Sequence, residues 1–170
     1  MGRTLWLIGM MGAGKSSVAP LVADALDRDW VDSDAVVEAQ TGRSVAALLA
    51  ESEDLFRIAE TDAILSLAGR DVVVATGGGV VMSDVVESMR ASGLVVWLRA
   101  GLSSLVDRVG KGEGRPLLPD EPEDALQWFE ADRRARYRAA AHEMIDTDDR
   151  EPSEVAERVV RAWANASSGV

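Results

Sequence analysis

Residues 9–16 read GMMGAGKS, and this glycine-rich segment is the most informative part of the chain. It matches the phosphate-binding pattern Gly-x-x-x-x-Gly-Lys-Ser/Thr and lies between a short apolar run and a segment of helical period. Its glycines allow the backbone to curl so that amide hydrogens, together with the helix N-terminus, face phosphate oxygens. We expect Lys15 to reach the terminal phosphates of a nucleotide and Ser16 to bind magnesium. An ordinary glycine-rich turn is the alternative, which the flanking elements disfavour.

Apolar runs alternate with longer segments of helical period along the chain, which is typical of an α/β protein built on a parallel sheet. The predicted strands, of which the last has the weakest pattern, are 4–8, 30–32, 72–75, 94–98 and 143–146. The predicted helices are 15–26, 35–40, 54–67, 83–91, 102–109, 123–141 and 153–166. We therefore predict a single domain over residues 1–170, with five strands in one open sheet.

Two segments fall outside this alternation. Residues 110–116 contain three glycines and a proline, and few apolar side chains follow before Ala125. We expect residues 110–122 to form a mobile lid that closes over bound substrates. Residues 166–170 are small and unanchored, so we expect a frayed tail there.

The composition limits the possible cofactors and partners. The sequence has no cysteine and one histidine, which excludes disulfides, thiolate zinc sites and histidine clusters, so oxygen atoms must hold any metal. The net charge of -11 argues against binding to nucleic acid or to anionic membranes. No apolar run approaches the length of a membrane span or of a signal-peptide core, so we expect a cytoplasmic protein. We assign the five tryptophans to the core.

A second polar signal, Asp32-Ser33-Asp34, comes at the end of the second predicted strand, where ligands of open parallel sheets gather. The third strand is followed by Thr76 rather than by a carboxylate, so Asp32 is the best candidate to hold magnesium. Asp34 would point to the same side if the chain stays extended, and it could accept a proton from a substrate hydroxyl. The alternative for Asp34 is the N-cap of the helix that starts near residue 35.

Glycines and an arginine supply further candidates. Residues 77–79 are three glycines after the third strand, and they either present backbone amides to a substrate or form a flexible turn. Arg57 follows Phe56 in a helical segment, and Glu60 is placed to hold its guanidinium. A surface ion pair is the alternative for Arg57.

The densest positive cluster is the arginine-rich helical segment 133–138. Glu130 can pair with Arg134 one turn later, which indicates a solvated face. Arg133 instead has Phe129 at the preceding turn, so we expect it to turn inward, although Glu130 remains a possible partner.

Taken together, these motifs resemble those of the shikimate kinases, in the family's order and at family-like spacings. The phosphate-binding loop is shared with many kinases, whereas the combination of Asp-x-Asp, Phe-Arg, triple glycine and Arg-Pro-Leu is more specific, and the resemblance covers nearly the whole chain. It rests on residues 9–16, 32–34, 56–57, 77–79, 115–117 and 133–137. It implies a P-loop fold like that of the nucleoside-monophosphate kinases, with strand order 2-3-1-4-5. The implied reaction transfers the γ-phosphoryl of ATP to the 3-hydroxyl of shikimate, on the route to chorismate and the aromatic amino acids.

The resemblance also implies roles for individual residues. Mg²⁺ would be held by Ser16 and, through water, by Asp32. The implied catalytic residues are Lys15, Asp34 as the base, and Arg115 from the lid. The implied ATP-binding residues, with Arg108 and Arg150 flanking adenine, are Gly12, Ala13, Gly14, Lys15, Ser16, Ser17, Arg108, Arg115 and Arg150. The implied shikimate-binding residues are Asp34, Arg57, Gly78, Gly79 and Arg133.

The chain departs from the family pattern in places. Many members have Arg-x-Pro-Leu-Tyr where residues 133–137 here read RRARY, so the choice of Arg133 depends on its distance from Tyr137. Ser52-Glu53 replaces a Gly-Glu pair before Phe-Arg, and Leu48-Leu49 replaces an aromatic residue in the wall of the expected shikimate pocket.

Two rival functions are weighed against this one. Another P-loop small-molecule kinase, such as a gluconate kinase, would share Lys15 and Ser16, but Arg57 and the triple glycine argue against it. A non-catalytic nucleotide-binding module would leave Asp34 and the lid without a purpose. We expect a monomer whose partners are ATP and shikimate.

Overall fold

The computed structural model describes residues 4–109 and 122–168 of the chain. Its sheet has five strands in the order β2-β3-β1-β4-β5, and all four neighbouring pairs are parallel. The strands are β1 (Thr4–Ile8), β2 (Asp29–Asp32), β3 (Val72–Ala75), β4 (Gly93–Arg99) and β5 (Glu143–Asp146). The predicted fold class and strand order are therefore confirmed. The predicted lid falls on residues that lie almost entirely outside the described part of the chain.

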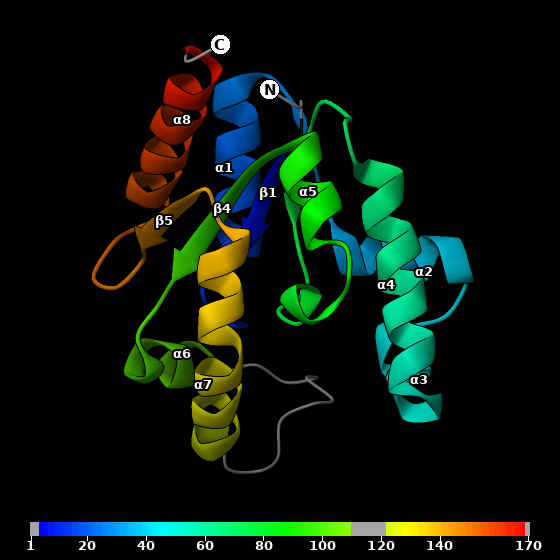
Figure 1. Cartoon of the computed structure of the whole chain (residues 1–170). Coiled ribbons are helices and arrows are strands. Elements are labelled where there is room, and N and C mark those ends of the chain that lie inside the picture. The colour runs from blue at the N-terminus through cyan, green and yellow to red at the C-terminus, as the bar shows by residue number, and fades with distance from the viewer. Residues whose placement is uncertain (1–3, 110–121, 169–170) are drawn as a thin grey trace.

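Helices cover both faces of this sheet (Figure 1). One face is packed by α1 (Lys15–Leu26) and α8 (Pro152–Ser168), and the other by α5 (Val86–Ser92) and α7 (Pro122–Ala140). The remaining helical elements are α2 (Ser33–Thr41), α3 (Val45–Glu51), α4 (Glu53–Leu67), the 3-10 turn η1 (Val80–Met82) and α6 (Leu102–Val109). Of these, α2, α3 and α4 surround a separate small apolar cluster beside the sheet. Parallel strands with helices on both faces are the arrangement that the alternating sequence pattern predicted.

Helix α3 and the end of α8 differ from the sequence-based prediction, and in place of the predicted helix 83–91 the chain forms η1 and then α5, which begins at Val86. Helix α3 was not predicted, because only Leu48 of its seven residues is buried, so the sequence carries little helical period there. The last helix continues to Ser168, so the frayed tail expected from Ala166 is wrong for residues 166–168. Ala166 packs on the core, and the hydroxyls of Ser167 and Ser168 each donate to the carbonyl four residues earlier.

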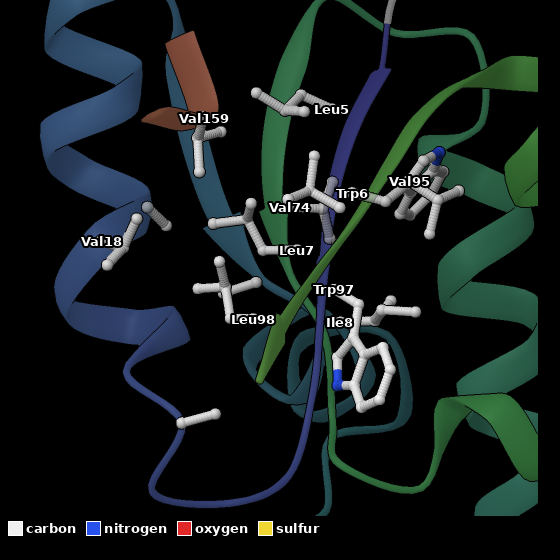
Figure 2. Close-up of a cluster of buried hydrophobic side chains, with 14 of the residues drawn as sticks. Leu5, Trp6, Leu7, Ile8, Val18, Val74, Val95, Trp97, Leu98 and Val159 are labelled. Atoms are coloured by element: carbon white, nitrogen blue, oxygen red, sulfur yellow. The ribbon is translucent and has the colours of Figure 1, made fainter. Parts of the chain in front are cut away.

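The core lies on both sides of the central strands, where every residue of β1 is buried. Figure 2 shows Leu5 and Leu7 on the side of Val18 from α1 and Val159 from α8, with Trp6 and Ile8 on the opposite side. This alternation follows from the pleat of a strand whose two faces are both covered. The tryptophans differ in exposure: Trp6 and Trp97 are buried, whereas Trp30 and Trp128 are 39% and 63% exposed. The assignment of all five to the core is therefore wrong for those two exposed residues.

The register of the strands brings the candidate motifs to one edge of the sheet. Ala75 of β3 pairs with Leu7 of β1 on one side and with Asp32 of β2 on the other. The phosphate-binding loop, the Asp-x-Asp motif and the triple glycine therefore all begin within a residue or two of the row of paired residues Leu7, Asp32 and Ala75, as expected for a ligand site at the carboxyl ends of parallel strands.

Within the described ranges, no helix is both long and apolar enough to cross a bilayer.

Candidate active site

The loop between β1 and α1 has the backbone of a phosphate-binding loop. Gly12 and Gly14 have φ angles of 82° and 95°, a region that glycine occupies without strain. A Cβ atom on Gly12 would also lie 2.8 Å from Cγ2 of Val109, so this position admits no side chain. Helix α1 begins directly after the loop, at Lys15, so its free amide groups face the same space.

A cavity of about 860 Å³ opens beside this loop. Six of the predicted ATP-binding residues line it: Gly12, Gly14, Lys15, Ser16, Ser17 and Arg108. Ala13 does not, because it is fully buried and its amide donates to the carbonyl of Met10. The ammonium of Lys15 donates to the carbonyls of Gly9 (2.7 Å) and Met10 (2.9 Å), which holds it against the loop.

Asp32 and Ser16 lie together at the end of β2. The Ser16 hydroxyl is 3.4 Å from Oδ2 of Asp32, while Oδ1 of Asp32 accepts the backbone amide of Asp34 at 2.9 Å. Asp32 is therefore the N-cap of α2, and the alternative of Asp34 as that cap is wrong. A hydroxyl and a carboxylate are the hard oxygen ligands that Mg²⁺ prefers, with waters completing the shell. No cluster of three or more acidic or histidine side chains suited to a metal occurs in residues 4–109 and 122–168.

Asp34 is left with an unusual environment because Asp32 performs the capping. It lines the cavity, and its Oδ1 is buried without a hydrogen-bond partner in the described structure. Burial, with the nearby charges of Asp32, Glu60 and Glu38, raises the pKa of Asp34 to about 6, although Lys15 opposes the shift. A carboxylate whose pKa lies near physiological pH, and whose oxygen lacks a protein partner, is suited to accept a proton.

The raised pKa predicts that Asp34→Asn stabilises the fold at neutral pH. The folded chain takes up a proton at Asp34 near pH 6 and the unfolded chain only near pH 4, so the ionised side chain costs stability above pH 6. We expect the variant to gain about 2 kcal/mol in free energy of unfolding at pH 7.5, and to gain little at pH 4. Urea unfolding of both proteins at the two pH values measures this difference. If Asp34→Asn were destabilised equally at both pH values, the raised pKa of Asp34 would be contradicted.

Side chains of the site approach the backbone of the triple glycine after β3 closely. A Cβ atom on Gly77 would lie 3.0 Å from Oδ1 of Asp34, and one on Gly79 would lie 2.6 Å from Nη1 of Arg57. The amide of Gly77 also donates to the Ser33 hydroxyl at 3.0 Å. These three glycines form part of the cavity wall.

Arg57 is fixed by carboxylates of its own helix. Its guanidinium lies 2.9 Å from Glu60 and 3.2 Å from Glu53. Glu60 is fully buried and also accepts the Ser83 hydroxyl at 2.8 Å, so the alternative of a surface ion pair is wrong. Glu60 lines the cavity itself, with Oε1 buried and unpaired within the described residues. From the sequence, Glu60 was expected only to bind the Arg57 guanidinium and not to line the cavity.

Arg133 turns inward, as predicted from the aromatic residue one turn before it. Its side chain is buried, its Cζ lies 4.3 Å from the centre of the Phe129 ring, and its Nη1 donates to the Gly78 carbonyl at 3.2 Å. Its Nε is buried and has no partner in the part of the chain that is described. Arg134 is more than half exposed and pairs with Glu130 at 3.3 Å, which confirms the solvated face.

The arginines expected around the nucleotide differ in position. Arg108 lines the cavity and donates to the carbonyls of Gly12 (3.3 Å) and Thr147 (3.0 Å), so it joins the phosphate-binding loop to the loop after β5. Arg150 donates to the carbonyl of Asp146 (3.0 Å) and is not among the residues that line the cavity. Arg115 lies outside the described residues.

Comparison with known proteins agrees with this geometry. The family model for shikimate kinase matches residues 11–164, which is most of the chain. The chain belongs to the shikimate kinase family. A shikimate kinase of Symbiobacterium thermophilum is 42% identical over 162 residues, which cover 91% of this chain and 92% of the relative. The activity of such a kinase is the ATP-dependent phosphorylation of shikimate.

Solved structures separate this family from the rival kinases. A shikimate kinase from Acinetobacter baumannii in complex with shikimate has a TM-score of 0.91 and 30% identity, covering all of this chain and 96% of that one. A gluconokinase from Sinorhizobium meliloti has a TM-score of 0.65 and 19% identity, covering 97% and 93% of the two chains. The second likeness shows only a shared fold, so the comparisons favour neither a gluconate kinase nor a non-catalytic module.

Proposed function

We propose that the cavity binds ATP at the phosphate-binding loop and shikimate against the triple glycine, with Asp34 between them as the base. The observation that carries this proposal is the juxtaposition, in one cavity, of an unpartnered carboxylate whose pKa is raised to about 6 with two guanidinium groups, the buried one of Arg133 and the 20% exposed one of Arg57. A hydroxylated carboxylic acid fits such a site, because its carboxylate pairs with the arginines and its hydroxyl donates to Asp34.

In the proposed reaction the 3-hydroxyl oxygen of shikimate forms a bond to the γ-phosphorus of ATP. The bond from that phosphorus to the bridging oxygen breaks, ADP leaves with its electron pair, and the hydroxyl proton passes to Asp34. Lys15 stabilises charge that develops on the phosphates, as the helix N-terminus of α1 does. Arg115 would add a second positive charge there, and Arg108 and Arg150 would flank adenine.

Ser16 and Asp32 would hold the magnesium ion. Their oxygen atoms lie 3.4 Å apart at the mouth of the phosphate-binding loop, and both are hard ligands. When bound, Mg²⁺ neutralises negative charge on the β- and γ-phosphates. Gly78 and Gly79 would contact the ring hydroxyls of shikimate through their backbone groups.

The two arginines that line the cavity provide the test of the shikimate site. We expect Arg57→Ala and Arg133→Ala each to raise the KM for shikimate about 10- to 100-fold, because a desolvated carboxylate loses a charge-assisted partner worth about 1.5 to 3 kcal/mol. The KM for ATP should change less than about threefold, since the ion pairs of Arg57 and the hydrogen bond of Arg133 are made with residues outside the phosphate-binding loop. Steady-state kinetics with each substrate varied in turn measures both constants.

Arg134→Ala is the matched control, since Arg134 is adjacent in sequence but exposed and paired with Glu130. We expect it to leave both KM values unchanged. A larger shikimate defect in Arg134→Ala than in Arg133→Ala would refute the proposed carboxylate clamp. Thermal unfolding of all three variants separates loss of binding from loss of fold, which matters for Arg57 because its removal leaves Glu60 buried without that cation.

A further inference from the structure

Two side chains of α7 converge on one backbone carbonyl in the cavity wall. The Gly78 carbonyl accepts a hydrogen bond from Nη1 of Arg133 at 3.2 Å and another from the hydroxyl of Tyr137. A carbonyl oxygen has two lone pairs, so these donors use its full capacity. Because the Gly78–Gly79 peptide is trans, the amide hydrogen of Gly79 points in the direction opposite to this carbonyl, away from α7.

Tyr137 is anchored by burial and by an aromatic contact with the sheet. Its side chain is 1% exposed, and its ring stacks on that of Trp97 in β4, with centroids 5.6 Å apart and planes inclined by 17°. Burial raises the pKa of Tyr137, although Arg133 opposes the shift, so the phenol stays protonated. A carbonyl can only accept, which makes this phenol a permanent donor to Gly78.

We propose that Tyr137 is a positioning residue for the acceptor substrate. Its hydroxyl fixes the plane of the Gly78–Gly79 peptide and, through the shared carbonyl, the orientation of the Arg133 guanidinium. With Nη1 committed to Gly78, the buried Nε of Arg133 is left without a partner among the described residues. This role rests on the proposed function, because it acts through two groups proposed to bind shikimate.

Tyr137→Phe tests the role, because it removes the hydroxyl and keeps the ring that stacks on Trp97. We expect the KM for shikimate to rise about tenfold, the equivalent of one hydrogen bond of ~1.4 kcal/mol. The KM for ATP should stay within about twofold, since the Tyr137 hydroxyl bonds to Gly78 and its ring stacks on Trp97, outside residues 9–16. Purified full-length chain is assayed with each substrate varied, and its melting temperature is recorded.

Arg90→Ala is the control for a general loosening of α7. Arg90 is exposed, and its Nη1 donates to the carbonyls of Ala139, Ala140 and Ala141 at the end of that helix, remote from Gly78 in the hydrogen-bond network. We expect Arg90→Ala to lower the melting temperature without raising the KM for shikimate. Equal rises in that KM for the two variants would overturn the positioning role, as would an unchanged KM in Tyr137→Phe. A parent protein without shikimate-dependent turnover would instead overturn the proposed function.

Discussion

Replacement of Lys15 by alanine is expected to lower kcat about 10²- to 10³-fold or more, because the site loses its point charge on the transferring phosphoryl group. The ammonium is anchored between the carbonyls of Gly9 and Met10, at the first residue of α1. The sequence has one other lysine, Lys111, and an arginine presents a planar fork rather than a compact charge. No neighbour in the described structure is therefore placed to substitute for Lys15.

Lys15→Met is the matched variant for this experiment. It keeps most of the apolar stem and removes only the charged end, so it should be as inactive as the alanine variant and closer to the parent in melting temperature. Single-turnover measurements with saturating ATP separate chemistry from binding. Normal turnover in a folded Lys15→Ala protein would show that residues 9–16 do not serve phosphoryl transfer.

Asp34→Asn is expected to lower kcat about 10²- to 10⁴-fold while the KM for ATP changes little, because the amide keeps the shape of the carboxyl but cannot accept the proton. In the parent, kcat should fall as the pH drops below about 6, where Asp34 becomes protonated and can no longer act as base. The same variant should be more stable than the parent at neutral pH, so its inactivity cannot be ascribed to unfolding.

Asp32→Asn controls for loss of a negative charge near the phosphates. This residue touches Ser16 and caps α2, so its replacement should shift the magnesium dependence of the rate rather than abolish turnover at saturating magnesium. Titration of magnesium in both variants distinguishes the roles. Identical magnesium curves for Asp32→Asn and the parent would contradict the division of labour between the two carboxylates.

The sequence predicted the sheet closely because its strands are short apolar runs separated by strong helical patterns. The bounds of β1 and β3, and of helices α1 and α6, coincide with those expected. Helix α3 was beyond such reasoning, since its start depends on tertiary and capping contacts: Glu38 accepts the amide of Val45, and Ser44 accepts that of Ala47. Trp30 was misassigned because β2 is an edge strand, which the local pattern does not reveal.

The site was predictable to the extent that its residues follow strand ends or share a helical face. Asp32, Asp34 and the glycines after β3 were found because they follow strand ends. The inward turn of Arg133 was found because Phe129 precedes it on the same helical face. The sequence could not say which aspartate caps α2, because that depends on the direction of one side chain. It also could not show that Tyr137 reaches Gly78, since this contact joins elements 59 residues apart.

The central claim is that this chain phosphorylates shikimate, and an ADP-release assay with three acceptor conditions tests it most directly. The purified chain is supplied with ATP and Mg²⁺ and with shikimate, gluconate or no acceptor, and the phosphorylated product is identified. We predict rapid ADP formation with shikimate, one phosphorylated shikimate for each ADP, and only slow background hydrolysis in the other two conditions. ADP formation that is faster with gluconate, or that does not depend on an acceptor, would contradict the claim.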